Sequence, residues 1–172
     1  MKNNNNHSDK SKRIAIYPGT FDPITFGHID IIRRAAPIFE KVLVTLAVNS
    51  SKLPLFTIDE RIEMIHRAIE GIEGVEVAMS KGLVVDYANS VGATVLIRGL
   101  RAVSDFEYEF QIALMNRKQQ SGVDTVFLMP DERYTYLSSS LIKEIARHGG
   151  SVDEFVPDFV AHQLKSKFQN NS

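Results

Sequence analysis

Short apolar segments alternate with amphipathic segments along almost the whole chain, and this alternation constrains the fold more than any other feature. Continuous apolar runs rich in β-branched residues are typical of parallel strands buried on both faces. Five such runs are predicted strands: 13–17, 41–48, 75–78, 94–97 and 125–129. Six helical patterns accompany them: 27–39, 57–70, 83–91, 104–119, 139–147 and 158–168. The order predicts an α/β fold, a Rossmann-like, doubly wound parallel five-stranded sheet with helices on both faces.

Local signals indicate where these segments end and how the chain divides. Pro37 predicts a kink or an early end in the first helix. Thr57-Ile-Asp-Glu60 and Ser104-Asp-Phe-Glu107 match the capping-box pattern of a helix N-terminus. The 172 residues are enough for one core. We therefore expect a single domain over residues 13–172, preceded by a polar, Asn-rich and disordered extension, residues 1–12.

The composition argues against several function classes. Twenty basic and 21 acidic residues give a net charge of −1, which disfavours broad nucleic-acid binding. The chain contains no cysteine, which excludes disulfides, thiol catalysis and cysteine-ligated zinc. No apolar run approaches the roughly 20 residues of a membrane span, and the N-terminus lacks the apolar segment of a signal peptide. We expect a cytoplasmic protein with no membrane and no nucleic-acid partner.

Residues suited to bind phosphate follow the first predicted strand. In an open α/β sheet, ligands bind beyond the carboxyl ends of the strands. Thr20 follows the first strand, and Gly27 and His28 begin the next helix. A helix N-terminus presents free N–H groups to an anion, glycine allows close approach of the backbone, and imidazole adds a donor. A histidine that only caps the helix is the alternative.

Further candidates follow the other strands. Lys52 follows the second strand, and Arg98 and Arg101 follow the fourth, where guanidinium groups could bind phosphate with planar geometry. Three hydroxyls, 138–140, begin a helix after the fifth strand. A surface lysine, solvated arginines and a serine-rich N-cap are the alternatives for these motifs taken singly. Their predicted convergence on one edge of the sheet favours a shared phosphate site.

The chain offers phosphate binders without an evident nucleophile. Glu107 and Glu109 are two positions apart on one helix, so one can point to the site and the other to water. No spacing matches a P-loop, a metal cage, a Ser-His-Asp triad or a pair of acid–base carboxylates. This inventory suits an enzyme that positions two phosphorylated substrates and neutralises charge. A catalytically silent nucleotide-binding module and an RNA-binding protein are the alternatives from another class.

Four blocks of the sequence stand out: Tyr17–Thr25, Gly27–Asp30, Thr94–Glu109 and Ser138–Ser140. Together they resemble the nucleotidyltransferase superfamily that carries (His/Thr)-x-Gly-His and, within it, the bacterial phosphopantetheine adenylyltransferases. The resemblance extends from Arg13 to about Phe168, and two positions depart from it: Phe26 replaces a frequent Asn, and Leu137 replaces the usual Ile. The 94–109 block separates this family from nicotinamide-mononucleotide adenylyltransferases and cytidylyltransferases.

The resemblance implies reversible transfer of adenylate from ATP to 4′-phosphopantetheine, which gives dephospho-coenzyme A and pyrophosphate in coenzyme A biosynthesis. It also implies Mg²⁺ as cofactor, a homohexamer and feedback inhibition by coenzyme A. Transfer to another phosphorylated acceptor is the alternative within the enzyme class. By matching position, His28 is the transition-state stabiliser. Positions that match acceptor binding are Thr20, Lys52, Val84 and Arg98. Positions that match ATP binding are Thr20, Phe21, His28, Gly99, Leu100, Arg101, Glu109, Tyr134, Thr135, Tyr136, Leu137, Ser138, Ser139 and Ser140.

Overall fold

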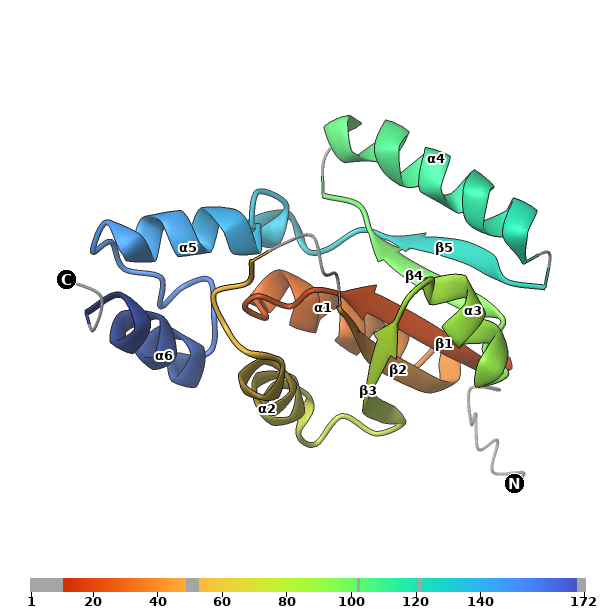
Figure 1. The fold of residues 1–172 in the computed structure, drawn as a ribbon, viewed down its shortest axis with the longest axis horizontal. Coiled ribbons are helices and arrows are strands. Elements are labelled where there is room, and N and C mark those ends of the chain that lie inside the picture. The colour runs from red at the N-terminus through yellow and green to blue at the C-terminus, as the bar shows by residue number, and fades with distance from the viewer. Residues whose placement is uncertain (1–10, 49–52, 102, 121, 170–172) are drawn as a thin grey trace, which may run out of the picture.

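A computed structural model of the chain shows one parallel sheet with helices on both of its faces (Figure 1). The structure describes residues 11–48, 53–101, 103–120 and 122–169. The strand order across the sheet is β3-β2-β1-β4-β5, and every neighbouring pair is parallel, which confirms the predicted fold class. The strands are β1 (Ser11–Gly19), β2 (Phe39–Val48), β3 (Val75–Lys81), β4 (Val95–Gly99) and β5 (Asp124–Leu128).

The predicted helices are all present within the described ranges. α1 ends at Ala35, before Pro37, as predicted. The capping box at Thr57 is confirmed, since its hydroxyl accepts from the Glu60 N–H at 3.2 Å and the Glu60 carboxylate accepts from the Thr57 N–H at 2.8 Å. The predicted box at Ser104 is wrong, because α4 already begins one residue earlier. The helices are α1 (Phe26–Ala35), α2 (Ile58–Ile69), α3 (Val84–Ser90), α4 (Val103–Gln119), α5 (Ser139–Arg147) and α6 (Asp158–Gln169), and a 3-10 turn, η1 (Glu132–Tyr134), precedes α5.

Both faces of the central strand are buried, which explains its continuous apolar sequence. Ala15 and Tyr17 pack into the core that includes α1, α2, α5 and α6, whereas Ile16 packs toward α3. Figure 1 shows α5 and α6 beyond the end of the sheet toward which the β1 arrow points. None of the helices in the described part of the chain is long and apolar enough to cross a membrane.

β1 and β4 meet at the point where the strand order reverses. Their pairing joins only Ala15 with Val95 and Ile16 with Leu96. β1 then continues to Gly19 and β4 to Gly99 without further pairing to each other. The strands therefore separate toward their carboxyl ends, where doubly wound sheets form their ligand crevice.

Candidate active site

A cleft of about 470 Å³ lies at the carboxyl ends of β1 and β4. Its walls come from the end of β1 and the loop after it, the start of α1, the end of β4, and the segment that leads into α5. Among the described residues that line it, none is aspartate or glutamate, so the cleft favours anions. The residues predicted from the sequence that line it are Thr20, His28, Val84, Arg98, Gly99, Arg101, Tyr134, Leu137, Ser138, Ser139 and Ser140.

Several other predicted site residues do not line this cleft. The ring of Phe21 is buried and packs edge-on against Tyr17 and His28, with ring centroids 5.7 and 5.2 Å away. Any contact of Phe21 with a nucleotide would therefore come from its main chain. Lys52 lies outside the described residues. The remaining predicted residues away from the cleft wall are Leu100, Glu109, Thr135 and Tyr136.

The loop after β1 is held in an unusual conformation by buried contacts. Phe21 has a φ of 43°, in the left-handed region that non-glycine residues rarely adopt. Its ring leaves no room for a side chain at Gly19, where a Cβ atom would lie 2.8 Å from Cζ of Phe21. Arg61, only 4% exposed, donates from Nη1 to the Thr20 carbonyl oxygen at 3.0 Å. These contacts fix Thr20 at the cleft without a ligand.

Asp22 joins this loop to two other parts of the chain. Its carboxylate accepts from the N–H groups of Leu55 and Phe56, at 3.1 and 3.0 Å, and from the Lys143 ammonium on α5. Burial alone would raise the pKa of Asp22, but Lys143 and the two amides hold it below its usual range. The carboxylate therefore stays ionised and fastens α5 beside the loop. No local sequence pattern marks the roles of Asp22 and Arg61, because their partners are far away along the chain.

His28 is part of the cap of α1. The Thr25 hydroxyl accepts from the His28 N–H at 3.4 Å, and His28 Nδ1 accepts from the Thr25 N–H at 3.1 Å. His28 thus takes the place that Glu or Gln has in the usual capping box. Because Nδ1 accepts a hydrogen bond, the proton of the neutral ring is on Nε2. The interpretation of His28 as a helix cap is therefore correct for Nδ1. The Nε2–H group remains as a hydrogen-bond donor.

The His28 ring is neutral near pH 7. Burial, with a smaller effect from the Arg101 charge, lowers the pKa of His28 to about 4. The rings of Phe21 and Tyr17 contribute to this burial, with centroids 5.2 and 6.5 Å from that of His28. His28 can therefore supply a hydrogen bond to an anion, while the positive charge of the cleft comes from its two arginines.

Arg98 is held at the cleft wall by protein groups. Its Nε and Nη2 donate to Oε2 and Oε1 of Glu109, both at 2.7 Å, and its Nη1 donates to the Pro18 carbonyl oxygen at 3.4 Å. Glu107 is exposed, as predicted for one of the two glutamates, whereas Glu109 contacts Arg98 and does not line the cleft. The solvated-surface alternative does not describe Arg98, which lies between β1 and α4.

Arg101 and the start of α5 form another part of the wall. Arg101 donates to the Leu137 carbonyl oxygen at 2.8 Å. The Ser138 hydroxyl caps α5 by accepting from the Leu141 N–H, so the N-cap alternative is correct for this serine. Ser139 donates to the Pro23 carbonyl oxygen at 2.8 Å. Ser140 is exposed, and its hydroxyl has no partner among the described residues, so it remains for a ligand.

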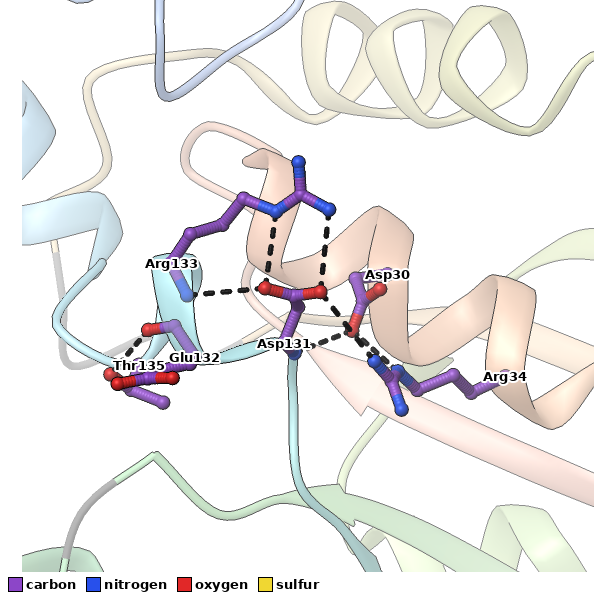
Figure 2. Close-up of polar contacts among 6 residues, drawn as sticks. All are labelled: Asp30, Arg34, Asp131, Glu132, Arg133 and Thr135. Carbon is purple, nitrogen blue, oxygen red and sulfur yellow. Dashed lines mark hydrogen bonds and ion pairs between the residues drawn. The ribbon is translucent and has the colours of Figure 1, made fainter.

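The turn that carries Tyr134 is fastened to α1 (Figure 2). The Asp131 N–H donates to Oδ2 of Asp30 at 2.9 Å, and the same oxygen accepts from Arg34 Nε at 2.8 Å. Arg133 in turn donates to the Asp131 carboxylate at 3.1 Å. Asp30 therefore links the first helix to a turn 101 residues further along the chain. No local pattern marks this role, which the sequence analysis missed.

Comparisons with known proteins agree with this architecture. The chain matches the family described as Cytidylyltransferase-like over residues 16–145. A phosphopantetheine adenylyltransferase of Caldanaerobacter subterraneus subsp. tengcongensis is 55% identical over 159 residues, 92% of this chain and 99% of that protein. One of Alkaliphilus metalliredigens is 53% identical over 155 residues, 90% and 99% of the two chains. A solved structure, Plasmodium falciparum nicotinic acid mononucleotide adenylyltransferase complexed with NaAD, has a TM-score of 0.66 at 13% identity and covers 90% of this chain and 95% of that one.

The sequence and structure comparisons differ in what they establish. The likeness to the solved structure, at 13% identity, concerns the fold alone. The identities of 53% and 55% extend over nearly the full length of both chains and therefore show the family. The resemblance first read from the motifs is thereby confirmed, and the chain belongs to the phosphopantetheine adenylyltransferase family within the cytidylyltransferase-like proteins.

Proposed function

We propose that this chain transfers adenylate from ATP to 4′-phosphopantetheine in coenzyme A biosynthesis, with dephospho-coenzyme A and pyrophosphate as products. The observation that carries the proposal is the convergence of a helix-capping histidine, two fixed arginines and a helix N-terminus on one anion-favouring cleft. The relatives named for this activity, at 53–55% identity, support the choice of substrates.

The reaction needs no general base. An oxygen of the acceptor phosphate forms a bond to the α-phosphorus of ATP, and the bond from that phosphorus to the bridging oxygen breaks as pyrophosphate leaves. The second pKa of a phosphomonoester is about 6, so the attacking oxygen is already ionised near neutral pH. Negative charge accumulates on the α-phosphoryl oxygens, where hydrogen-bond donors stabilise it.

His28 is the donor we assign to that charge. Its Nδ1 is engaged by Thr25, which fixes the ring and leaves the Nε2 proton to donate into the cleft. A neutral imidazole near a helix N-terminus is an effective electrophilic donor in other enzymes. The low pKa of His28 also argues against a role as a proton acceptor near pH 7.

The two substrates occupy opposite parts of the cleft in this proposal. Arg98, with Lys52 and Thr20, binds the acceptor phosphate, and Val84 at the start of α3 contacts the pantetheine arm. Arg101 and the free hydroxyl and amides at the start of α5 bind the ATP phosphates. The other matched positions around the nucleotide remain predictions: Phe21, Gly99, Leu100, Thr135, Tyr136 and Leu137.

Mg²⁺ enters this site with ATP in our proposal. Among the described residues, no three His, Asp or Glu side chains lie together as a metal cage. Mg²⁺ commonly keeps water ligands and binds substrate phosphates, and Thr20 and Ser140, which both carry hydroxyls, line the cleft. Bound there, it would neutralise phosphate charge. EDTA should abolish turnover yet leave the melting temperature of the ATP-free protein unchanged, and a lowered melting temperature would instead indicate a structural metal.

Self-association, feedback and location complete the proposal. α4 exposes three apolar side chains four residues apart, Phe106, Phe110 and Leu114, with exposed fractions of 47%, 45% and 51%. Such a stripe is typical of a surface covered by another protein, and closed homo-oligomers are common, which supports the proposed homohexamer.

Coenzyme A, which contains the acceptor's pantetheine arm, would inhibit by competing for the cleft. We place the enzyme in the cytoplasm.

Pyrophosphate release tests the proposed reaction. With ATP, the wild-type protein should form pyrophosphate rapidly in the presence of 4′-phosphopantetheine and little with nicotinamide mononucleotide or ribose phosphates. CTP in place of ATP serves as the nucleotide control. Equal turnover of nicotinamide mononucleotide would contradict the acceptor assignment, and preference for CTP would contradict adenylyl transfer.

A further inference from the structure

We propose that Arg61 is a positioning residue for adenylate transfer, which holds the Thr20–Phe21 peptide so that the Phe21 N–H donates to the α-phosphoryl group of ATP. Arg61 lies in the first turn of α2. The proposal rests on the proposed function and deepens it, because Thr20 and Phe21 keep the substrate contacts proposed for them. It adds a residue of another element that determines where one of these contacting groups points.

The Arg61 guanidinium is buried and bound to carbonyl oxygens. The residue is only 4% exposed. Its Nη1 donates to the Thr20 carbonyl oxygen at 3.0 Å, and its Nε donates to the Thr57 carbonyl oxygen at 3.3 Å. Buried charges are usually paired, but among the described residues no carboxylate forms an ion pair with Arg61, and nearby Asp22 is bound by Lys143 instead. The charge of Arg61 therefore acts mainly on the peptide groups that it contacts.

The contact with Arg61 determines the direction of the Phe21 N–H. The carbonyl group of Thr20 and the N–H group of Phe21 belong to one planar trans peptide, in which the two bonds point in opposite directions. Since Arg61 takes the carbonyl oxygen, the N–H points away from the guanidinium. No described residue accepts a hydrogen bond from this N–H, so it is left for a ligand. The φ of 43° at Phe21 shows that the loop keeps this orientation in a backbone conformation that is rare for a non-glycine residue.

Arg61 should also strengthen the N–H as a donor. A charged group that donates to a carbonyl oxygen polarises the peptide, and linked hydrogen bonds reinforce one another. The Phe21 ring packs edge-on against the His28 ring, with centroids 5.2 Å apart, so the backbone of Phe21 lies near the other donor that we propose for the transition state. A donor that is fixed before the reaction needs no reorganisation when charge develops on the phosphoryl oxygens.

A side chamber of about 120 Å³ adjoins the cleft and reaches Arg61. The residues that line both spaces are Thr20, Ser139 and Ser140. In Arg61→Ala, the chamber would extend into the space that the guanidinium leaves. A free guanidinium ion carries the same planar set of N–H donors and could donate there to the Thr20 carbonyl oxygen. The structure therefore allows a test by chemical rescue.

Two further variants are the controls. Arg61→Met removes the same charge and donors but fills the vacated space, so guanidinium cannot enter. Arg67→Ala removes an exposed arginine from the same helix. The loss of one hydrogen bond is small against the stability of a domain, so all three variants should fold. Thermal melts would establish this at the assay temperature, and steady-state and single-turnover kinetics would give kcat, both KM values and the rate of the chemical step.

Arg61→Ala and Arg61→Met should both lower kcat and the single-turnover rate about 10²-fold, as for the loss of one transition-state donor, with either KM changed less than about threefold. Guanidinium chloride at millimolar concentration should raise the rate of Arg61→Ala about tenfold and leave Arg61→Met unchanged, because only the smaller side chain leaves room. Sodium chloride at the same concentration should rescue neither variant. Arg67→Ala should keep the wild-type kcat under all these conditions.

Wild-type kcat in a folded Arg61→Met enzyme would overturn the proposal. So would a defect seen only as a raised KM, because Arg61 would then act on binding rather than on the transfer step. A slow Arg61→Ala enzyme that guanidinium does not restore would show that its loss disturbs more than the Thr20–Phe21 peptide, which also overturns the proposal. If Arg61→Ala does not fold, Arg61→Met decides the question, and failure of both to fold would reduce Arg61 to a structural residue. Wild-type protein inactive with 4′-phosphopantetheine would refute the proposed function itself.

Discussion

At the scale of single residues, His28 caps α1 and is also the donor that we propose for the transition state. Nδ1 completes the cap of α1, and Nε2 carries the proton that we propose is donated into the cleft. Substitution by alanine removes both functions together. Glutamine is the replacement that keeps the cap, because it is a usual capping-box residue and its oxygen can accept from the Thr25 N–H.

His28→Ala should lower kcat by about 10²–10³, the usual effect of losing one transition-state donor, and should also remove about 1 kcal/mol of stability with the cap. His28→Gln should keep the melting temperature near that of the wild type and lower kcat less, because its amide N–H groups can partly replace the imidazole donor. Thr57→Ala, which removes the cap of α2 outside the cleft, should lower stability alone. Steady-state kinetics and thermal melts decide the matter: a His28→Ala enzyme with lowered stability and unchanged kcat would show that His28 is only a helix cap.

The same ring should also make the folded state sensitive to acid. The pKa of His28 is about 4 in the folded protein, well below the ordinary histidine value of 6.5 that applies in the unfolded chain. Below pH 6.5 the unfolded chain therefore takes up a proton before the folded protein does, which favours unfolding. The loss of stability grows as the pH falls from 6.5 toward 4. Thermal melts across this range should show a larger decrease for wild type than for His28→Gln, and parallel decreases would contradict the low pKa.

At the scale of elements, the turn before α5 depends on α1 for its position. Asp30 accepts from the Asp131 N–H and fixes the segment that leads to Tyr134 (Figure 2). Asp30→Ala would leave that amide unpaired, which costs about 1–3 kcal/mol if no water replaces the carboxylate. We expect the KM for ATP to rise about tenfold, with a smaller change for the acceptor.

Arg34→Ala is the matched control for Asp30→Ala. It removes the exposed ion pairs of Arg34 with Asp30 and Asp131 but keeps the bond between Asp30 and the Asp131 amide. Exposed ion pairs contribute about 0–1 kcal/mol, so this variant should behave nearly as wild type. Equal effects of the two substitutions on the KM for ATP would show that charge alone sets the position of the turn. That result would contradict the role proposed for the hydrogen bond from the Asp131 N–H to Asp30.

Sequence patterns were sufficient to predict the helices, the strands and many residues of the cleft wall. They were not sufficient to predict the residues whose hydrogen bonds hold that wall in place. Buried parallel strands have continuous apolar sequences, and the rule for doubly wound sheets places residues that follow the strands at one edge. That reasoning found His28, Arg98 and the start of α5. It missed Asp22, Asp30 and Arg61, because a backbone partner far along the chain leaves no local signature.

At the scale of the whole molecule, α4 connects the cleft to the outer surface. One side of the helix holds Arg98 through Glu109, while Phe106, Phe110 and Leu114 are exposed. The rings of Phe106 and Phe110 stack on each other, with centroids 5.6 Å apart, and so present a continuous apolar area. The apolar surface that we propose for self-association and the glutamate that holds Arg98 thus belong to the same helix, α4.

A charge placed in this apolar area should therefore prevent assembly. Burying an unpaired carboxylate in an interface is strongly unfavourable, so Phe110→Asp should shift the protein from a closed oligomer to smaller species in sedimentation equilibrium. Ile38→Asp, which changes another exposed apolar side chain away from α4, should leave the oligomer intact. Because α4 also holds Arg98, loss of the oligomer should raise the KM for 4′-phosphopantetheine more than the KM for ATP. A wild-type protein that is monomeric at micromolar concentration would contradict the assembly without affecting the catalytic assignment, whereas an oligomer that survives Phe110→Asp would place the interface elsewhere.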